Sequence, residues 1–161
     1  MGLIMELQYK QLNELPFWQR LRTARAISKV VCAEAANDKM KQVTARALLA
    51  RKFSLVALDG AHVAGHVSVE GPIVGALFVG SEHRNKRIAA YLVAAATDFV
   101  IGQGLEPVAY CNERSVGVFT YCGYSEMISD KPNRTKMHLI ISAAQTGESQ
   151  PRTLMGMMMA A

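Results

Sequence analysis

The sequence predicts a mixed α/β fold, in which helices cover one β-sheet. Two patterns alternate along the 161 residues: short segments with apolar residues at every second position, and longer segments with apolar residues three or four positions apart. Their order is strand, two helices, three strands, helix, strand, helix and two strands, which is typical of a sheet with helices packed on it. Half of the residues are hydrophobic, and this length suits one compact domain with a sizeable core.

The first 52 residues predict one strand and two helices. Apolar and polar residues alternate over 5–9, which is the period of a half-buried strand. Over 15–34 the apolar residues recur at helical spacing, so a helix is expected there. Asn37 and Asp38 are favoured capping residues, and a second helix is expected to follow them over 40–52.

Three consecutive strands are predicted next. Residues 53–58 form the first, Asp59-Gly60 is a strong hairpin signal, and 62–70 form the returning strand. Residues 73–79 are almost all apolar, which is typical of a central strand covered on both faces. The apolar face of the returning strand is expected to consist of Val63, Val67 and Val69.

The second half of the chain is predicted to alternate helices with strands. A long helix over 87–101 is followed by a short strand over 107–111 and a short helix over 112–121. Two closing strands over 124–128 and 136–142 are expected to pair with each other.

The composition indicates one domain over 1–142 and a flexible tail over 143–161. The tail has neither capping residues nor a sustained amphipathic period. The three cysteines show no paired or metal-binding spacing, so neither a secreted disulfide framework nor a zinc site is expected. No apolar run approaches the roughly 18 residues that a membrane span requires. These observations favour a cytoplasmic protein with no metal and no membrane partner.

Positive charge is concentrated in the first third of the chain. Up to residue 52 there are ten Lys and Arg against four Asp and Glu, whereas the other 109 residues carry eight against nine. Such a region attracts anions, including nucleic acid, acidic proteins and phosphorylated small molecules. A solvated helix face is the simpler interpretation, because no nucleic-acid-binding motif accompanies these charges.

The most informative segment is the loop between the central strand and the long helix. Over 80–87 it reads Gly-Ser-Glu-His-Arg-Asn-Lys-Arg. The first turn of a helix attracts phosphate, because its backbone N–H groups are unpaired and the helix dipole is positive there. Arg84, Lys86 and Arg87 add positive side chains beside that turn. The loop is therefore a candidate phosphate site.

Two signatures resemble the GNAT family of acyl-CoA-dependent N-acetyltransferases. The first is the hexapeptide RNKRIA at 84–89, which is similar to the family's Arg/Gln-x-x-Gly-x-Gly/Ala motif. The second follows about 25 residues later and is formed by Asn112, Ser115, Phe119, Gly123 and Tyr124. With the order of the elements, the resemblance covers 5–142. It implies the GNAT fold, a central mixed and mostly antiparallel sheet with one splayed parallel pair and helices on both faces.

The resemblance implies acetyl-CoA as co-substrate, bound between the strands at 73–79 and 107–111. Backbone groups near Leu77 and Val79 would pair with the pantetheine, and one N–H there would polarise the thioester carbonyl. Asn112 would hold the pantetheine from the other side, although an Asn before a helix is also a favoured N-cap. The residues that the resemblance assigns to the co-substrate are Leu77, Phe78, Val79, Arg84, Asn85, Lys86, Arg87, Ile88, Ala89, Asn112, Ser115 and Phe119.

Two positions depart from the family's pattern. Arg87 stands where the family usually has Gly, so either the loop bends differently or Arg87 contacts the phosphate itself. Phe119 stands where the family often has a Tyr that protonates the leaving thiolate, and Phe has no proton to give. Tyr121 lies about 200° around the helix axis from Phe119 and is not expected to replace that Tyr.

An amine must lose a proton to attack a thioester, so a general base is expected near the central strand. The even spacing of His62, His66 and Glu70 predicts that they share one face of a strand. Glu70 is the predicted base, with a surface carboxylate as the simpler interpretation. Tyr110 shares strand parity with Asn112 and is predicted to supply the missing acid, with a packed aromatic ring as the alternative.

The leading hypothesis is an enzyme that transfers acetyl from acetyl-CoA to a primary amine of a small molecule, peptide or protein. The two departures motivate a rival, a degenerate domain that binds CoA as a regulatory module. A binder of nucleic acid or acidic protein through the basic N-terminal helices is a third hypothesis. A homodimer is compatible with all three.

Overall fold

The computed structural model describes residues 6–38, 44–84 and 87–139, and its centre is a seven-stranded sheet in the order β1-β2-β3-β4-β5-β7-β6. Only β4 and β5 run parallel; the other neighbouring strands are antiparallel. This confirms the predicted mixed, mostly antiparallel sheet. The strands are β1 (Gln8–Gln11), β2 (Phe53–Asp59), β3 (His62–Glu70), β4 (Ile73–Val79), β5 (Val108–Cys111), β6 (Ser125–Met127) and β7 (Thr135–His138).

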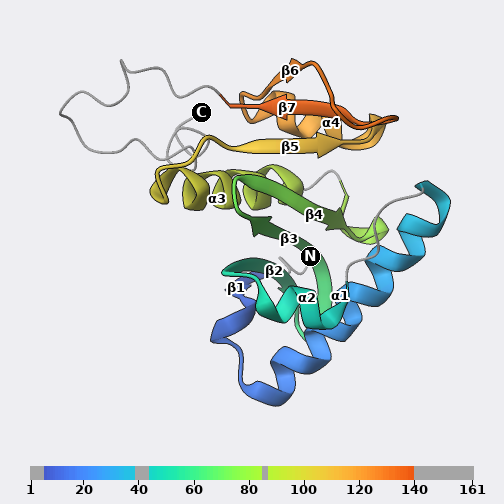
Figure 1. The fold of residues 1–161 in the computed structure, drawn as a ribbon. Coiled ribbons are helices and arrows are strands. Elements are labelled where there is room, and N and C mark those ends of the chain that lie inside the picture. Colours follow the sequence, from blue (N-terminus) through green and yellow to red (C-terminus); the bar gives the residue numbers. More distant parts are fainter. Residues whose placement is uncertain (1–5, 39–43, 85–86, 140–161) are drawn as a thin grey trace.

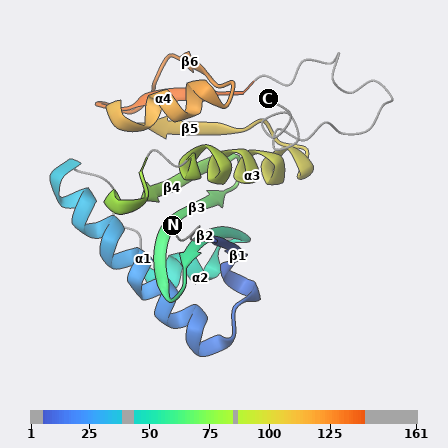
Figure 2. The ribbon, with the colours of Figure 1, turned by 180° about the vertical axis from the view of Figure 1, so that it is seen from behind.

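In the described part of the chain, four helices cover the two faces of this sheet (Figures 1 and 2). They are α1 (Phe17–Asp38), α2 (Ala45–Ala50), α3 (Ile88–Gly102) and α4 (Glu113–Tyr121), and short 3₁₀ turns lie at η1 (Leu12–Glu14) and η2 (Ser81–His83). One apolar core joins the sheet to α3 and α4, and a second joins the opposite face to α1 and α2. The sheet therefore has an α3 face and an α1 face.

The N-terminal helices differ from the prediction at their junction. α1 runs to Asp38, so Asn37 and Asp38 belong to its last turn instead of capping the next helix. The cap of α2 is Thr44, whose Oγ1 accepts a hydrogen bond from the backbone N–H of Ala47 at 3.1 Å. Part of the predicted second helix, and the predicted tail over 143–161, lie outside the described residues.

The side chains of β3 switch from one face of the sheet to the other partway along the strand, because the pairing of β3 with β2 shifts between Ala57 and Leu58. The extra residue on β3 reverses the alternation of side chains. Val67 and Val69 pack in the core on the α3 face, whereas Val63 packs against the core on the α1 face. The prediction that these three valines share a face was wrong, since even spacing holds only in a regular strand.

A second irregularity lies in β4, at the centre of the sheet. His66 pairs with Phe78 and Ser68 pairs with Gly75, so β4 holds one more residue than β3 in this interval. Val74 accordingly faces α3, while Phe78, four positions later, faces α1. Ala76, inside this bulge, has a left-handed backbone with φ of 49°.

No helix within 6–38, 44–84 or 87–139 is both long enough and apolar enough to cross a membrane.

Candidate functional site

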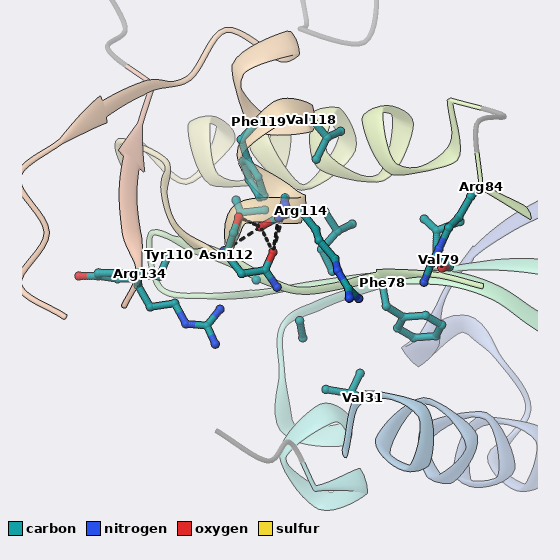
Figure 3. Close-up of a pocket in the computed structure, with 15 residues that line it drawn as sticks. Val31, Phe78, Val79, Arg84, Tyr110, Asn112, Arg114, Val118, Phe119 and Arg134 are labelled. Carbon is teal, nitrogen blue, oxygen red and sulfur yellow. Dashed lines mark hydrogen bonds between the residues drawn. The ribbon is translucent and has the colours of Figure 1, made fainter. Parts of the chain in front are cut away.

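The parallel strands β4 and β5 separate almost as soon as they meet. Their ladder has one residue pair, Ile73 with Val108, next to a hydrogen bond from the Val108 N–H to the Pro72 carbonyl at 2.9 Å. Beyond this point the two strands diverge around a cavity of about 480 Å³ (Figure 3). β4, β5, α4 and Val31 of α1 contribute to its walls, so the splayed pair forms a cleft through the sheet.

The cleft brings together residues from both sequence signatures. Those predicted residues that line it are Leu77, Phe78, Val79, Arg84, Tyr110, Asn112, Ser115 and Phe119. Arg87, Ile88 and Ala89 line an adjacent cavity of about 380 Å³, which shares Val79 and Val118 with the cleft. Asn85 and Lys86 lie outside the described residues.

The loop before α3 is anchored to the sheet by several polar contacts. The Gly80 N–H donates to the Ala64 carbonyl at 2.8 Å, and His83 Nε2 lies 3.0 Å from Asp59 Oδ2 in the hairpin between β2 and β3. Arg84 Nε donates to the Val79 carbonyl at 3.3 Å. These contacts hold the loop against the end of β4, where α3 begins.

Arg87 is the N-cap of α3 and adopts a left-handed backbone, with φ of 58° and ψ of 12°. This is the conformation that glycine adopts at little cost, and it stands at the position where the GNAT motif has Gly. The loop therefore keeps a glycine-like backbone despite its Arg side chain, and a contact between Arg87 and the phosphate stays a prediction. The N-terminus of a 15-residue helix, with Arg84 and Arg87 preceding it, suits an anion.

Asn112 serves as the N-cap of α4. Its Oδ1 accepts hydrogen bonds from the backbone N–H groups of Arg114 at 3.1 Å and Ser115 at 3.0 Å. Ser115 Oγ in turn accepts from the Asn112 N–H at 3.1 Å, completing a capping box. The capping alternative for Asn112 is thus realised, and it fixes the Asn112 side chain at the rim of the cleft.

Phe119 occupies the position of the expected general acid. Its side chain is buried, and its ring meets the ring of Tyr124 edge to face at 5.1 Å between centroids. The Tyr124 hydroxyl lies 2.7 Å from Thr97 Oγ1 inside the core, and burial raises the pKa of Tyr124. Phe119 therefore contributes an apolar surface to the cleft and no proton donor.

Tyr110 lies at the edge of the cleft in a charged environment. Its hydroxyl donates to Asp130 Oδ1 at 3.0 Å, and this bond is the main reason why the pKa of Asp130 is lowered. Lys131 Nζ lies 3.9 Å from the centroid of the Tyr110 ring, and Lys136 Nζ lies 5.7 Å from it. The hydroxyl is thereby directed toward the loop between β6 and β7.

Glu70 does not lie in the cleft. It ends β3, and 68% of its side chain is exposed. Its Oε2 accepts a hydrogen bond from Arg51 Nη2 at 3.0 Å, and it lines a separate cavity near the C-terminal end of α3. The structure therefore separates Glu70 from Tyr110 and Asn112 instead of bringing them together.

The bulge in β4 is held by His66, for which the sequence favoured a hydrogen-bonded or exposed histidine over a base. His66 Nδ1 lies 3.0 Å from the Ala76 carbonyl, and His66 Nε2 lies 2.6 Å from Ser54 Oγ. A carbonyl only accepts, so Nδ1 carries the proton and Nε2 accepts from the Ser54 hydroxyl. His66 is fully buried, and its burial lowers its pKa to about 4. His62 is exposed at the far end of β3, beyond the shift in pairing, so the two histidines do not share a face.

Arg114 and Arg134 also line the cleft, and sequence reasoning missed both. Arg114 is the second residue of α4, and Arg134 directly precedes β7. In Figure 3, Arg84 lies toward one end of the cavity and Arg134 toward the other, with Arg114 between them. Arg114 lies within the segment of the second signature, whereas the approach of Arg134 to the cleft depends on the pairing of β5 with β7. Within the described ranges, no three His, Cys, Asp or Glu side chains are grouped to hold a metal ion.

The comparison with sequence families gives one match. The model described as the acetyltransferase (GNAT) family matches residues 18–124, which is about two thirds of the chain. These residues include both signatures and the whole of β4 and β5. No curated protein matches the chain in sequence.

Solved structures of similar fold agree with this match. An acyl-CoA N-acyltransferase from Pseudomonas aeruginosa superposes with a TM-score of 0.65 at 12% identity, over 84% of this chain and 99% of that one. YncA from Salmonella typhimurium, a putative acetyltransferase solved with acetyl-CoA, gives 0.62 at 15% identity, over 85% and 95%. The PaiA N-acetyltransferase from Thermoplasma acidophilum, solved in complex with coenzyme A, gives 0.55 at 14% identity, over 85% and 100%.

Proposed function

Because the chain belongs to the GNAT acetyltransferase family, we propose that it transfers an acetyl group from acetyl-CoA to the primary amine of an acceptor. The observation that supports this most directly is the cleft between β4 and β5, where both signatures meet. The neighbours solved with acetyl-CoA and coenzyme A support the choice of donor. In this reaction the acceptor nitrogen bonds to the acetyl carbon and the carbon–sulfur bond breaks. The nitrogen loses one proton, and the CoA thiolate takes one up.

The start of α3 is the proposed site for the pyrophosphate. The unpaired N–H groups of its first turn, together with Arg84 and Arg87, supply donors and positive charge there. The left-handed backbone of Arg87 gives the chain the path that glycine gives in the family motif. Ile88 and Ala89 continue the same surface into the adjacent cavity.

The free edge of β4 is the proposed site for the pantetheine and the thioester. Past Ile73, β4 has no described ladder partner on its β5 side. The Ala76 carbonyl accepts from His66 and the Val79 carbonyl from Arg84, so the remaining backbone groups of this edge are the ones that would pair with an extended ligand. An N–H of this edge near Leu77 or Val79 would donate to the thioester oxygen as negative charge develops. Such donors stabilise a transition state by about 2.7–4 kcal/mol. His66 acts through the bulge and is a positioning residue.

Proton transfer is the step for which the cleft offers the fewest side chains. Phe119 has no donor, and the Tyr110 hydroxyl is engaged by Asp130. A free thiol has a pKa of about 8.5, so the CoA thiolate can leave with water as the proton source at mildly alkaline pH. We therefore propose slow turnover without a side-chain acid. Tyr110 as the acid stays a prediction, and the position of Glu70 argues against its role as the base.

A second candidate function is a module that binds CoA without transferring acetyl. The observation that favours it is Phe119, because general acid catalysis typically contributes about 10²–10⁴ in rate. The two candidates agree on CoA binding and differ only in turnover. They are therefore separated by measuring both properties in the same preparation.

The first experiment measures thermal stability against acetyl-CoA concentration. At a hundredfold excess over its dissociation constant, acetyl-CoA should stabilise the folded protein by about 2.7 kcal/mol. Arg84→Glu should lose most of this response, because it places a negative charge beside the phosphates. Arg46→Glu is the matched control, since Arg46 is exposed on α2 and does not line the cleft. An equal response in all three proteins would overturn the phosphate site.

The second experiment measures CoA release with a broad panel of primary amines. The parent should release CoA above the rate of spontaneous hydrolysis, and Phe119→Tyr should raise turnover with little change in CoA affinity. Tyr110→Phe should leave the rate nearly unchanged if water supplies the proton, and should lower it about 10²–10⁴-fold if Tyr110 does. CoA binding without release in any of these proteins would favour the binding module.

A further inference from the structure

The cleft has a charge imbalance that the binding of CoA leaves partly unexplained. Among the residues that the structure describes, the charged residues that line it are Arg84, Arg114 and Arg134, and no acidic residue lines it. Arg84 adjoins the start of α3 and is accounted for by the phosphates. Arg114 and Arg134 instead flank Asn112, from α4 and from the residue before β7.

Arg134 reaches the cleft from the α1 face of the sheet. Thr135 pairs with Cys111 and Lys136 with Tyr110, so Arg134 continues this ladder beside Asn112. Side chains at every second position share a face, which places Arg134 with Lys136 and Tyr110. Cys111, at the intervening position, packs in the core on the α3 face. The helix that would hold the phosphates, α3, lies on the face opposite to Arg134.

Neither guanidinium is neutralised within the part of the chain that the structure describes. The contacts there include no side-chain hydrogen bond and no ion pair for Arg114 or Arg134. Asp130, the nearest carboxylate in the Tyr110 environment, accepts from the Tyr110 hydroxyl and lies 3.6 Å from Lys136 Nζ. Arg134 is only partly exposed, so an anion bound to it would be partly screened from water.

We propose that the acceptor is an amine that also carries a carboxylate, and that Arg134, from the α1 face, and Arg114, from α4, bind this carboxylate in the cleft. This inference rests on the proposed acetyl transfer. A guanidinium presents a planar fork of N–H donors that matches a carboxylate with two parallel hydrogen bonds. Binding there would hold the acceptor near the point where the cleft passes through the sheet, with its amine directed at the thioester. Arg114 and Arg134 are thereby specificity residues.

The test compares acceptors that differ only in the carboxylate. Glycine, aspartate and glutamate are each paired with their carboxamides, and a dipeptide with its amidated form distinguishes a peptide from a free amino acid. In the parent, kcat/KM for the acids should exceed that for the amides at least tenfold. Arg134→Gln should remove most of this preference through KM, and Arg134→Glu should reverse it. Arg46→Gln, which removes one exposed positive charge from α2, should keep the preference.

Binding gives a readout that does not depend on turnover. In protein saturated with CoA, each acid should raise the melting temperature more than its amide, and Arg134→Gln and Arg114→Gln should abolish the difference. Equal shifts or equal kcat/KM for acids and amides would overturn the inference, whatever the rate. A loss of acetyl-CoA affinity in Arg134→Gln would also overturn it, by assigning Arg134 to CoA. Carboxylate-dependent shifts without acetyl transfer would instead reject the proposed function and retain the binding site.

Discussion

At the scale of single residues, Arg87 combines a charge with an unfavourable backbone. Its φ of 58° lies in the left-handed region, which costs an ordinary residue about 1–2 kcal/mol. The two properties can be separated, because Arg87→Gly removes both the side chain and the strain, whereas Arg87→Ala removes only the side chain. This pair therefore tells whether the loop contributes its backbone or its guanidinium to phosphate binding.

We expect Arg87→Gly to be about 1 kcal/mol more stable than Arg87→Ala, because only Gly adopts this backbone freely. Chemical denaturation measures this difference. If the guanidinium contacts the phosphates, both variants should lose CoA affinity to the same extent. If the backbone alone is used, both should bind CoA like the parent. Equal stability of the two variants would contradict the left-handed conformation.

At the scale of elements, the bulge in β4 depends on a hydrogen-bonded chain from β2 through β3. Ser54 donates to His66, and His66 donates to the carbonyl of Ala76, which has φ of 49°. Arg51 reaches the same sheet face and donates to Ser68 Oγ at 2.6 Å. A protonated His66 would lose its acceptor nitrogen and place a charge in the core. Both hydrogen bonds of His66 therefore form only while His66 is neutral.

This arrangement predicts a specific loss of stability in acid. The pKa of His66 is about 4 in the folded protein, whereas the unfolded chain has the ordinary value of about 6.5. Between these values the unfolded chain binds a proton that the folded protein does not, so stability falls as the pH falls. The loss from pH 6.5 to pH 4 should be roughly 3 kcal/mol.

The measurement is the free energy of unfolding of the parent and of His66→Gln at several pH values. Gln keeps a donor and an acceptor but does not titrate, so the difference between the two proteins isolates His66 from the carboxylates. The variant should be less stable than the parent at pH 7 and should approach it near pH 4. Parallel curves for the two proteins would exclude this role of His66.

The sequence predicted elements well where the signal is local. The hairpin of β2 and β3 follows from Asp59-Gly60, and β4 and α3 begin and end within a residue or two of their predicted bounds. The faces of these strands were predicted less well, because each bulge inserts one residue and reverses the alternation after it. Nothing in the local pattern marks a bulge, since the hydrogen bonds that stabilise it come from other strands.

The residues of the candidate site were also predicted where the signal is local and missed where it is not. Motif residues such as Arg84, Asn112 and Phe119 were found from the two signatures and do line one cleft. Arg134 was missed, because its position depends on the register of β7 against β5 and no motif contains it. Glu70 was chosen because it lies just before the central strand and shares parity with His66, but neither property places it at the cleft. The spacing of residues in the sequence therefore does not determine which of them meet at the site; the pairing of distant strands does.

At the scale of the whole molecule, four of the ten Lys and Arg residues in the basic N-terminal third lie on α1, which packs on the face of the sheet opposite α3 and α4. Arg22, Arg25 and Lys29 are all exposed on this helix, three and four positions apart. They form a solvated stripe, in keeping with the simpler interpretation of the basic N-terminal third. The α1 face of the sheet is also the face from which Arg134 enters the cleft. Positive charge at both places would attract an anionic acceptor from a distance.

We expect the single residue pair between β4 and β5 to divide the sheet into two cooperative units. β1 to β4 form one ladder, and β5, β7 and β6 form another with α4 beside it. Apart from that pair, the units are joined mainly by α3, which packs on β3, β4 and α4. We expect amide hydrogen exchange to occur in two groups, with the amides of β5, β6 and β7 exchanging faster than those of β2 and β3.

A ligand seated along both diverging strands would act as the missing strand between these units. Acetyl-CoA should therefore slow exchange in both groups and bring their opening free energies closer together, instead of protecting only the residues that it touches. Arg84→Glu, which should not retain the ligand, should keep two separate groups at the same acetyl-CoA concentration. Exchange of the whole sheet at one rate without ligand would show that α3 alone makes it a single unit. In the expected case, the substrate completes the hydrogen-bonded continuity of the sheet each time it binds, and the protein loses that continuity each time the product leaves.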